Sequence, residues 1–233
     1  MLTLEDLALS GLAGVLCATV SGDDRASLGG DRVLPYALLY RLGFAPWERR
    51  DVADTWRRLL EGTDAPVTGR ALDVGCGSGR DAVYLAKRGW TVTAVDSVDK
   101  ALATARRRAA EEGVEVQWVK GDVAALDRLG LEPGYNLLYD FGCIHGLSDA
   151  ARTGAAAGLT HLAAPGATLL MVAFKAGRGI VLPRGMDKQD VVALPRDGWD
   201  LEESRSVATD DTPAVLRRAN PTAYRLTRRT AAA

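Results

Sequence analysis

The stretch Ala71-Leu-Asp-Val-Gly-Cys-Gly-Ser-Gly79 decides the fold, because it joins a short apolar run to a turn that contains three glycines. About twenty residues later, a second apolar run ends in Asp96. A strand that leads into a glycine-rich turn, followed by a strand that ends in an acid, is typical of α/β domains that bind a nucleoside cofactor. The glycines have the spacing G-x-G-x-G rather than the G-x-G-x-x-G of dinucleotide-binding turns, so the pattern disfavours NAD.

Strand-like and helix-like periods alternate from Arg70 onward. We expect strands at 71–74, 91–95, 115–119, 135–139, 167–174, 199–208 and 223–227, and helices at 81–88, 99–112, 148–163 and 187–194. Such alternation predicts an α/β fold, in which a mostly parallel sheet carries helices on both faces.

Residues 1–65 lack this alternation and are expected to form a helical cap. Apolar residues at helical spacing predict helices at 7–20, 33–44 and 51–60. The segment at 7–20 is too short to cross a bilayer, and Glu5 and Asp6 precede it where a signal peptide has cationic residues. We therefore interpret it as a buried helix, followed from residue 66 to 233 by the α/β domain.

The overall charge excludes several classes of partner. Lysine and arginine number 29 against 30 aspartate and glutamate residues, so no global field attracts nucleic acid or an anionic membrane. The arginines near the end of the chain are expected to form a solvated face rather than a binding patch; they are Arg217, Arg218, Arg225, Arg228 and Arg229. The three cysteines are widely spaced, which argues against a disulfide framework and a metal site and fits a reducing cytoplasm.

The acid-x-Gly-x-Gly-x-Gly pattern from Asp73 to Gly79 resembles the first motif of the class I S-adenosylmethionine-dependent methyltransferases. The resemblance implies S-adenosyl-L-methionine as the cofactor and S-adenosyl-L-homocysteine as the product. It also implies a Rossmann-like, doubly wound sheet of seven strands in the order 3-2-1-4-5-7-6, with the last strand antiparallel.

Further motifs resemble a bacterial subgroup of small-molecule methyltransferases related to the thiopurine and tellurite enzymes. They are Asp140-x-Gly-Cys-x-His-Gly146, Pro46-Trp47-Glu48 and Gly79-Arg80. The resemblance implies methyl transfer to a small acceptor, namely a thiol, amine, hydroxyl or metalloid. A sulfonium methyl is already activated, so we expect in-line transfer to an acceptor that the protein orients. The sequence leaves the oligomeric state open between a monomer and a homodimer. The first thirty residues have no counterpart in that subgroup, so the cap on the acceptor side is expected to differ.

The residues expected to bind the cofactor follow the ends of the first four strands, with one aromatic residue in the cap. The glycines allow the backbone to approach the methionine part, and Asp96 can accept hydrogen bonds from both ribose hydroxyls. The resemblance implies that Asp122 takes the adenine amine and that Val123 lies on the ring, while Trp47 could close over the cofactor. The full set is Trp47, Asp73, Gly75, Cys76, Gly77, Gly79, Asp96, Ser97, Asp122, Val123 and Asp140.

His145 is the candidate catalytic residue. Its ordinary pKa lies near neutrality and it follows the fourth expected strand, so it could remove a proton from the acceptor. The alternative is a structural histidine that bonds the loop backbone. The sequence leaves both interpretations open.

Two other functions compete with methyl transfer. A non-catalytic protein that binds S-adenosylmethionine as a partner or sensor would need the same turn and acids. A nucleotide-dependent oxidoreductase could use the same sheet, although the glycine spacing disfavours it.

Overall fold

The computed structural model describes residues 54–175, 185–194, 198–207 and 220–230 of the 233-residue chain. Trp47, the helices expected at 7–20 and 33–44, and most of the expected cap at 1–65 lie outside these residues. The described part of the cap begins with α4 (Asp54–Glu61), which covers residues 54–60 of the helix expected at 51–60 and ends one residue beyond it.

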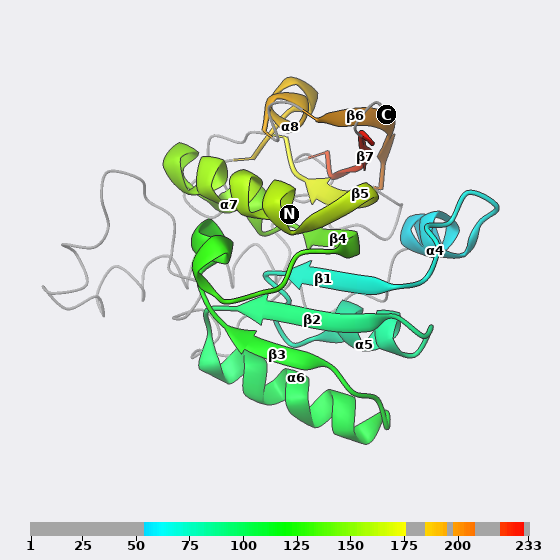
Figure 1. The fold of residues 1–233 in the computed structure, drawn as a ribbon, viewed down its shortest axis with the longest axis vertical. Helices are drawn as coiled ribbons and strands as arrows, with labels where there is room; N and C mark the ends of the chain where they lie inside the picture. Colours follow the sequence, from blue (N-terminus) through cyan, green and yellow to red (C-terminus); the bar gives the residue numbers. More distant parts are fainter. Residues whose placement is uncertain (1–53, 176–184, 195–197, 208–219, 231–233) are drawn as a thin grey trace, which may run out of the picture. The chain divides into compact units, whose positions relative to one another are not determined.

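Seven strands form one sheet in the order β3-β2-β1-β4-β5-β7-β6. Figure 1 shows β3, β2, β1 and β4 lying side by side. The strands are β1 (Arg70–Val74), β2 (Thr91–Asp96), β3 (Gln117–Lys120), β4 (Tyr135–Phe141), β5 (Ala163–Ala173), β6 (Trp199–Ser206) and β7 (Thr222–Arg228). The predicted order is therefore confirmed.

The strands β1 to β5 pair in parallel, whereas β7 runs antiparallel to both β5 and β6. The reversal of the last strand in the sequence is therefore also confirmed. Because β1 lies between β2 and β4, the winding of the chain reverses at β1 and β4. Ligands of open α/β sheets bind at the carboxyl ends of the strands at such a point.

Helices cover both faces of the sheet. Residues of α4 and of α5 (Arg80–Ala86) join one apolar cluster with Ala71, Leu137 and Leu170, and α6 (Asp99–Glu111) packs beside α5. Residues of α7 (Asp149–Leu162) and α8 (Lys188–Ala193) join the other cluster with Leu72 and Leu138. Neighbouring residues of one strand thus point into opposite cores, as the alternation of a pleated strand requires.

Some boundaries differ from those predicted. The strand β5 begins at Ala163 rather than at 167, because the chain stays extended through an irregular stretch in which Gly166 has a φ of 74° and the register with β4 shifts. Two short 3₁₀ helices follow β3 and β4, namely η2 (Val123–Arg128) and η3 (Ile144–Gly146). They are too short to leave a periodic pattern in the sequence.

Candidate functional site at the carboxyl edge of the sheet

The turn that follows β1 is built from glycines in a left-handed backbone conformation. The φ angles of Gly75, Gly77 and Gly79 are 70°, 54° and 74°. A Cβ atom on Gly75 would lie 2.5 Å from Cys143 Sγ, and one on Gly79 would lie 2.5 Å from Trp118 Cη2. Neither Cβ atom has room, so both conformation and packing favour glycine at positions 75 and 79, while the left-handed backbone favours it at 77.

The carboxylate of Asp96 holds this turn against the end of β2. Its Oδ2 accepts a hydrogen bond from the Gly77 amide at 2.9 Å, and its Oδ1 accepts one from the Val98 amide at 2.8 Å. The Gly75 amide also donates to the Val95 carbonyl, at 2.8 Å. The glycine turn and the acid that ends β2, which the sequence predicted to act together, are thus in direct contact.

Asp73 is buried within a group of acids at this edge. Its side chain is 2% exposed, and its Oδ2 has no hydrogen-bond partner in the structure. Burial is the largest cause that raises the pKa of Asp73 well above its ordinary value, and the charges of Asp81, Asp140 and Asp96 raise it further. A cation at this edge would favour the ionised form of Asp73.

Asp140 shapes the loop after β4. It is fully buried, and its Oδ1 accepts hydrogen bonds from the amides of Cys143 at 2.8 Å and Ile144 at 3.2 Å, while its Oδ2 has no partner. Burial raises the pKa of Asp140 to about 7, although the two amides act in the opposite direction. Asp140 therefore holds the first turn of η3 and titrates near neutral pH.

His145 lies inside the protein. The side chain is 0% exposed, Nδ1 is 3.4 Å from the Val172 carbonyl oxygen, and the ring meets the Phe174 ring edge-on at 4.8 Å between centroids. Burial lowers the pKa of His145 to about 4, the Val172 carbonyl opposes this change, and the charge of Arg152 adds to it. These contacts favour the structural interpretation over that of a general base.

The remaining predicted residues occupy varied positions. Ser97 is exposed after β2, and Cys76 is half-buried in the turn, where burial raises the pKa of its thiol. Asp122 is exposed and caps η2 by accepting a hydrogen bond from the Ala124 amide at 2.9 Å. Val123 is 6% exposed and belongs to the core beneath α7, so little of its surface faces outward.

Two arginines at the same edge were not among the predicted site residues, although the Gly79-Arg80 motif included one of them. Arg80 pairs with Asp81 at 3.1 Å and lies over the Phe141 ring, with its guanidinium carbon 5.6 Å from the ring centre. Arg152 donates hydrogen bonds to carbonyl groups of two separate loops. The only local signal for Arg152 was a charge four residues after the cap Ser148 in a helix otherwise rich in alanine.

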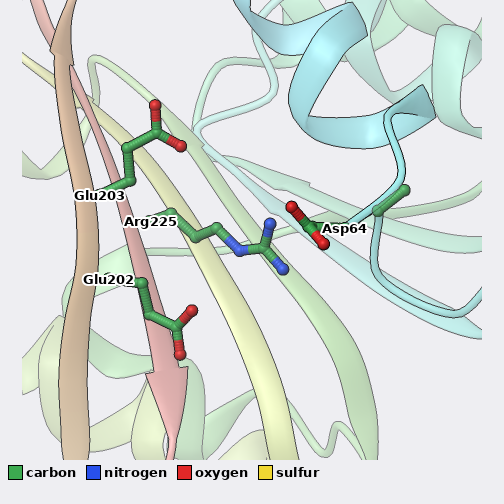
Figure 2. A pocket seen from close by; sticks show the side chains of 5 residues that line it. Asp64, Glu202, Glu203 and Arg225 are labelled. Atoms are coloured by element: carbon green, nitrogen blue, oxygen red, sulfur yellow. The ribbon is translucent and has the colours of Figure 1, made fainter.

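The terminal arginines that the structure describes have partners within the fold or line a pocket away from this edge. Arg228 donates to the Ala163 carbonyl, and Arg229 pairs with Asp200 at 2.7 Å. Arg225 lines an open pocket of about 440 Å³. In Figure 2 its guanidinium points toward Asp64.

This pocket is not the site that the sequence predicted. Its lining residues are Asp64, Ala65, Glu202, Glu203 and Arg225, none of which is a predicted site residue. In the register of β5 with β7, Arg225 lies opposite Leu170, which is in the interior of β5. The pocket that Arg225 lines is therefore not at the carboxyl end of β5.

Two kinds of feature are absent from the described residues, namely a cluster of metal ligands and a membrane-spanning helix. No group of three or more metal-ligating side chains is found in residues 54–175 and the shorter described segments. Within those same residues, no helix has the length and apolar character needed to cross a bilayer.

Comparison with known proteins agrees with this geometry. A family described as "Methyltransferase domain" matches residues 71–166, which begin in β1 and include the glycine turn. A 2-heptyl-1-hydroxyquinolin-4(1H)-one methyltransferase of Mycobacteroides abscessus is 31% identical over 130 residues, which are 55% of this chain and 56% of that protein. A ubiquinone biosynthesis O-methyltransferase of a Caulobacter species is 49% identical over 47 residues, 20% of this chain and 19% of that protein. The chain thus spans little more than half the length of the first relative and about a fifth of the second.

Solved structures share the fold. A TehB-like SAM-dependent methyltransferase of Corynebacterium glutamicum aligns with a TM-score of 0.60 at 22% identity, over 84% of this chain and 98% of that chain. The N-methyltransferase NodS of Bradyrhizobium japonicum, solved with S-adenosyl-L-homocysteine, aligns with a TM-score of 0.60 at 18% identity, over 82% of this chain and 91% of that chain.

Proposed function

We propose that this chain is a class I S-adenosylmethionine-dependent methyltransferase, and that it transfers a methyl group in line from that cofactor to a small-molecule acceptor. The observation that carries the proposal is the buried acid group around Asp73, next to a glycine turn that leaves no room for side chains. Neither curated relative is covered over its full length, so the activity on a given acceptor is a matter for experiment.

The residues at the carboxyl edge fit the cofactor. S-adenosyl-L-methionine carries a sulfonium and an ammonium group, and Asp73 offers a buried carboxylate oxygen that lacks a partner. A cation near Asp73 would offset the effect of the negative charges of Asp81 and Asp140 on this carboxyl. The left-handed glycines would let the backbone approach the amino-acid part, as the spacing predicted.

When bound, the cofactor supplies a methyl group that is already activated, so the protein has mainly to orient the acceptor and exclude water. In this proposal Asp96 faces the ribose, while it also keeps Gly77 in place through the hydrogen bond described above. Asp122, Val123 and Ser97 border the adenosine, and Asp140 fixes the loop on the acceptor side. The role of Trp47 over the cofactor stays a prediction.

We assign His145 to the framework of the acceptor loop rather than to proton transfer. A buried imidazole with a pKa of about 4 stays neutral at pH 7, and its Nδ1 faces a carbonyl oxygen of β5. Acceptors that lose their proton readily need little help from a base. One curated relative is named as the methyltransferase of a hydroxyquinolinone and the other as an O-methyltransferase, so we would test oxygen acceptors first, before thiols, amines and metalloid oxyanions.

The decisive experiment joins cofactor binding to turnover. Titration calorimetry with S-adenosyl-L-homocysteine should give saturable binding, and Asp96→Asn should weaken it by about tenfold or more, because a hydrogen bond to a charged group contributes about 1.5–3 kcal/mol. Asp99→Asn is the matched control, since Asp99 is exposed and pairs with Lys120. A parent chain that gives no binding heat and no thermal shift would refute the proposal.

An acceptor screen then separates the enzyme from the sensor. Formation of S-adenosyl-L-homocysteine with any acceptor supports catalysis, whereas tight binding with no turnover across the screen supports the sensor. We also propose that the protein is cytoplasmic, since the two described cysteines are free thiols, as in a reducing compartment. We further propose that it is a monomer or a homodimer.

A further inference from the structure

The acceptor side of the site is defined by two segments that leave neighbouring strands. If the nucleoside lies over β2 and β3 and the amino-acid part over β1, as proposed above, the acceptor lies toward β4 and β5. The loop 142–147 follows β4, and the described segment that begins at Gly185 lies between β5 and α8. The distance between the loop 142–147 and the Gly185 segment therefore affects how much space the acceptor has.

One side chain contacts both segments. Arg152, in the first turn of α7, donates from Nη2 to the His145 carbonyl and, at 2.7 Å, to the Gly185 carbonyl. Its Nη1 lies 3.8 Å from Asp149 Oδ1, and the Arg152 side chain is 12% exposed. The guanidinium is therefore largely enclosed, and it links two carbonyl groups that lie 40 residues apart in the sequence (185 minus 145).

The two segments also share Phe174. The Met186 amide donates to the Phe174 carbonyl at 2.8 Å, while the Phe174 ring meets the imidazole of His145. The Arg152 contact therefore closes a ring of contacts that runs from the β4 loop through Phe174 to Met186. A planar guanidinium with several fixed donors suits such a bridge better than a lysine ammonium does.

We infer that Arg152 is a positioning residue that holds the His145 loop and the Gly185 segment at a fixed separation on the acceptor side of the site. This inference rests on the proposed function for its catalytic consequence. Nothing in it requires Arg152 to touch the cofactor or the acceptor. Its loss should therefore reduce turnover while cofactor binding persists, since a displacement of about 1 Å can cost about a hundredfold in rate.

The test uses the full chain with Arg152→Met, Arg152→Lys and the control Arg107→Met. Arg107 is an arginine of α6 that is 71% exposed and pairs only loosely, at 3.7 Å, with Glu111. Hydrogen exchange of the backbone amides is measured by mass spectrometry in residues 142–147 and 185–190. Binding of S-adenosyl-L-homocysteine is measured by calorimetry, and kcat and KM are measured with the acceptor that the screen provides.

Arg152→Met should speed exchange in both segments by about tenfold or more and lower kcat by a similar factor, with the dissociation constant for S-adenosyl-L-homocysteine within about threefold of the parent. Arg152→Lys should recover part of each effect, and Arg107→Met should change nothing. Unchanged exchange in Arg152→Met would overturn the inference whether or not the chain methylates anything. An equal loss of cofactor binding and turnover would overturn it too, since that would indicate general damage to the fold. Absence of cofactor binding in the parent would instead refute only the proposed function.

Discussion

Among the described residues, several buried polar atoms without a protein partner lie where the strands end. Asp73 and Asp140 each keep a buried carboxylate oxygen without a partner, and His145 keeps its Nε2 in the same state. A buried polar atom that lacks a hydrogen bond costs free energy, so such atoms are rare unless a ligand or a proton satisfies them. For both aspartates, burial favours the protonated form.

The pKa of Asp140 leads to a prediction about stability. Since the folded-state pKa is about 7 against an ordinary value of 3.8, this group stabilises the fold below pH 4, and its contribution is lost as the pH rises toward 7. Asp140→Asn cannot ionise, so its free energy of unfolding relative to the parent should rise by up to about 4 kcal/mol between pH 4 and pH 8. Urea unfolding at several pH values measures the difference.

Asp200→Asn is a control in which the expected dependence of stability on pH has the opposite sign. Its hydrogen bond with Arg229 lowers the pKa of Asp200, so this exposed residue stabilises the fold above its unfolded pKa. The variant should lose a little stability at pH 8 and none in strong acid. A free-energy difference between Asp140→Asn and the parent that does not vary with pH would contradict the prediction.

The glycine turn allows a second prediction at this scale. Gly79→Ala must adopt a φ of 74° and place its Cβ 2.7 Å from Ala105 Cβ, whereas Gly113→Ala has a φ of 66° with nothing within 4 Å. Both variants should lose about 1–2 kcal/mol from the left-handed conformation. Gly79→Ala should lose about 1–3 kcal/mol more from overpacking. Equal losses in urea unfolding would show that the contact with Ala105 relaxes freely.

At the scale of elements, the helix α7 lies very close to η2. A Cβ atom on Gly154 would be 2.3 Å from the Ala124 carbonyl oxygen, and one on Gly158 would be 2.7 Å from Leu126 Cβ. Two glycines within one helix therefore allow it to approach the 3₁₀ helix that follows β3. The close packing compensates for the poor helix propensity of glycine.

Gly154→Ala tests this packing. Alanine favours a helix over glycine by about 1 kcal/mol, yet the clash with a backbone oxygen should give a net loss of about 2 kcal/mol in the free energy of unfolding. The control Ala157→Gly changes an exposed position of the same helix and should lose about 1 kcal/mol. A Gly154→Ala variant that unfolds at higher urea than the parent would show that the two elements can separate at little cost.

Elements with a clear period were predictable from the sequence, whereas contacts between elements were not. The alternation after Arg70 gave the strands and helices within a few residues, and the family resemblance gave their order in the sheet. Helix α8 begins at Lys188 after the cap Asp187, close to the predicted start. The burial of His145 and the bridge made by Arg152 depend on how β5 and α7 meet the loop after β4, which no local pattern encodes.

At the scale of the whole molecule, the near-neutral charge balance conceals a local excess of acid. Net charge is −1, yet at the carboxyl edge the charges of Asp81, Asp140 and Asp96 all raise the pKa of Asp73. The balanced net charge predicted that the whole chain would not attract a polyanion. It carries no information about the local electric field at one edge of the sheet. A small cation is the ligand that this local field favours.

The acid group predicts that binding of S-adenosyl-L-methionine releases protons. A bound cation lowers the pKa of Asp73 and Asp140, so the complex holds fewer protons than the free protein, and affinity should rise between pH 5.5 and pH 7. Calorimetry in two buffers of different ionisation enthalpy counts the released protons. Asp140→Asn should release fewer of them, and an affinity that falls as the pH rises would contradict the prediction.

The reversed strand β7 has a consequence for biosynthesis. It is the last strand in chain order, yet it lies between β5 and β6 in the sheet. As a nascent chain leaves the ribosome, β5 and β6 have no partner on their facing edges until residues 222–228 have been made. The core around β1 to β4 can assemble early, whereas the far edge of the sheet stays open for pairing with other chains until the final strand inserts.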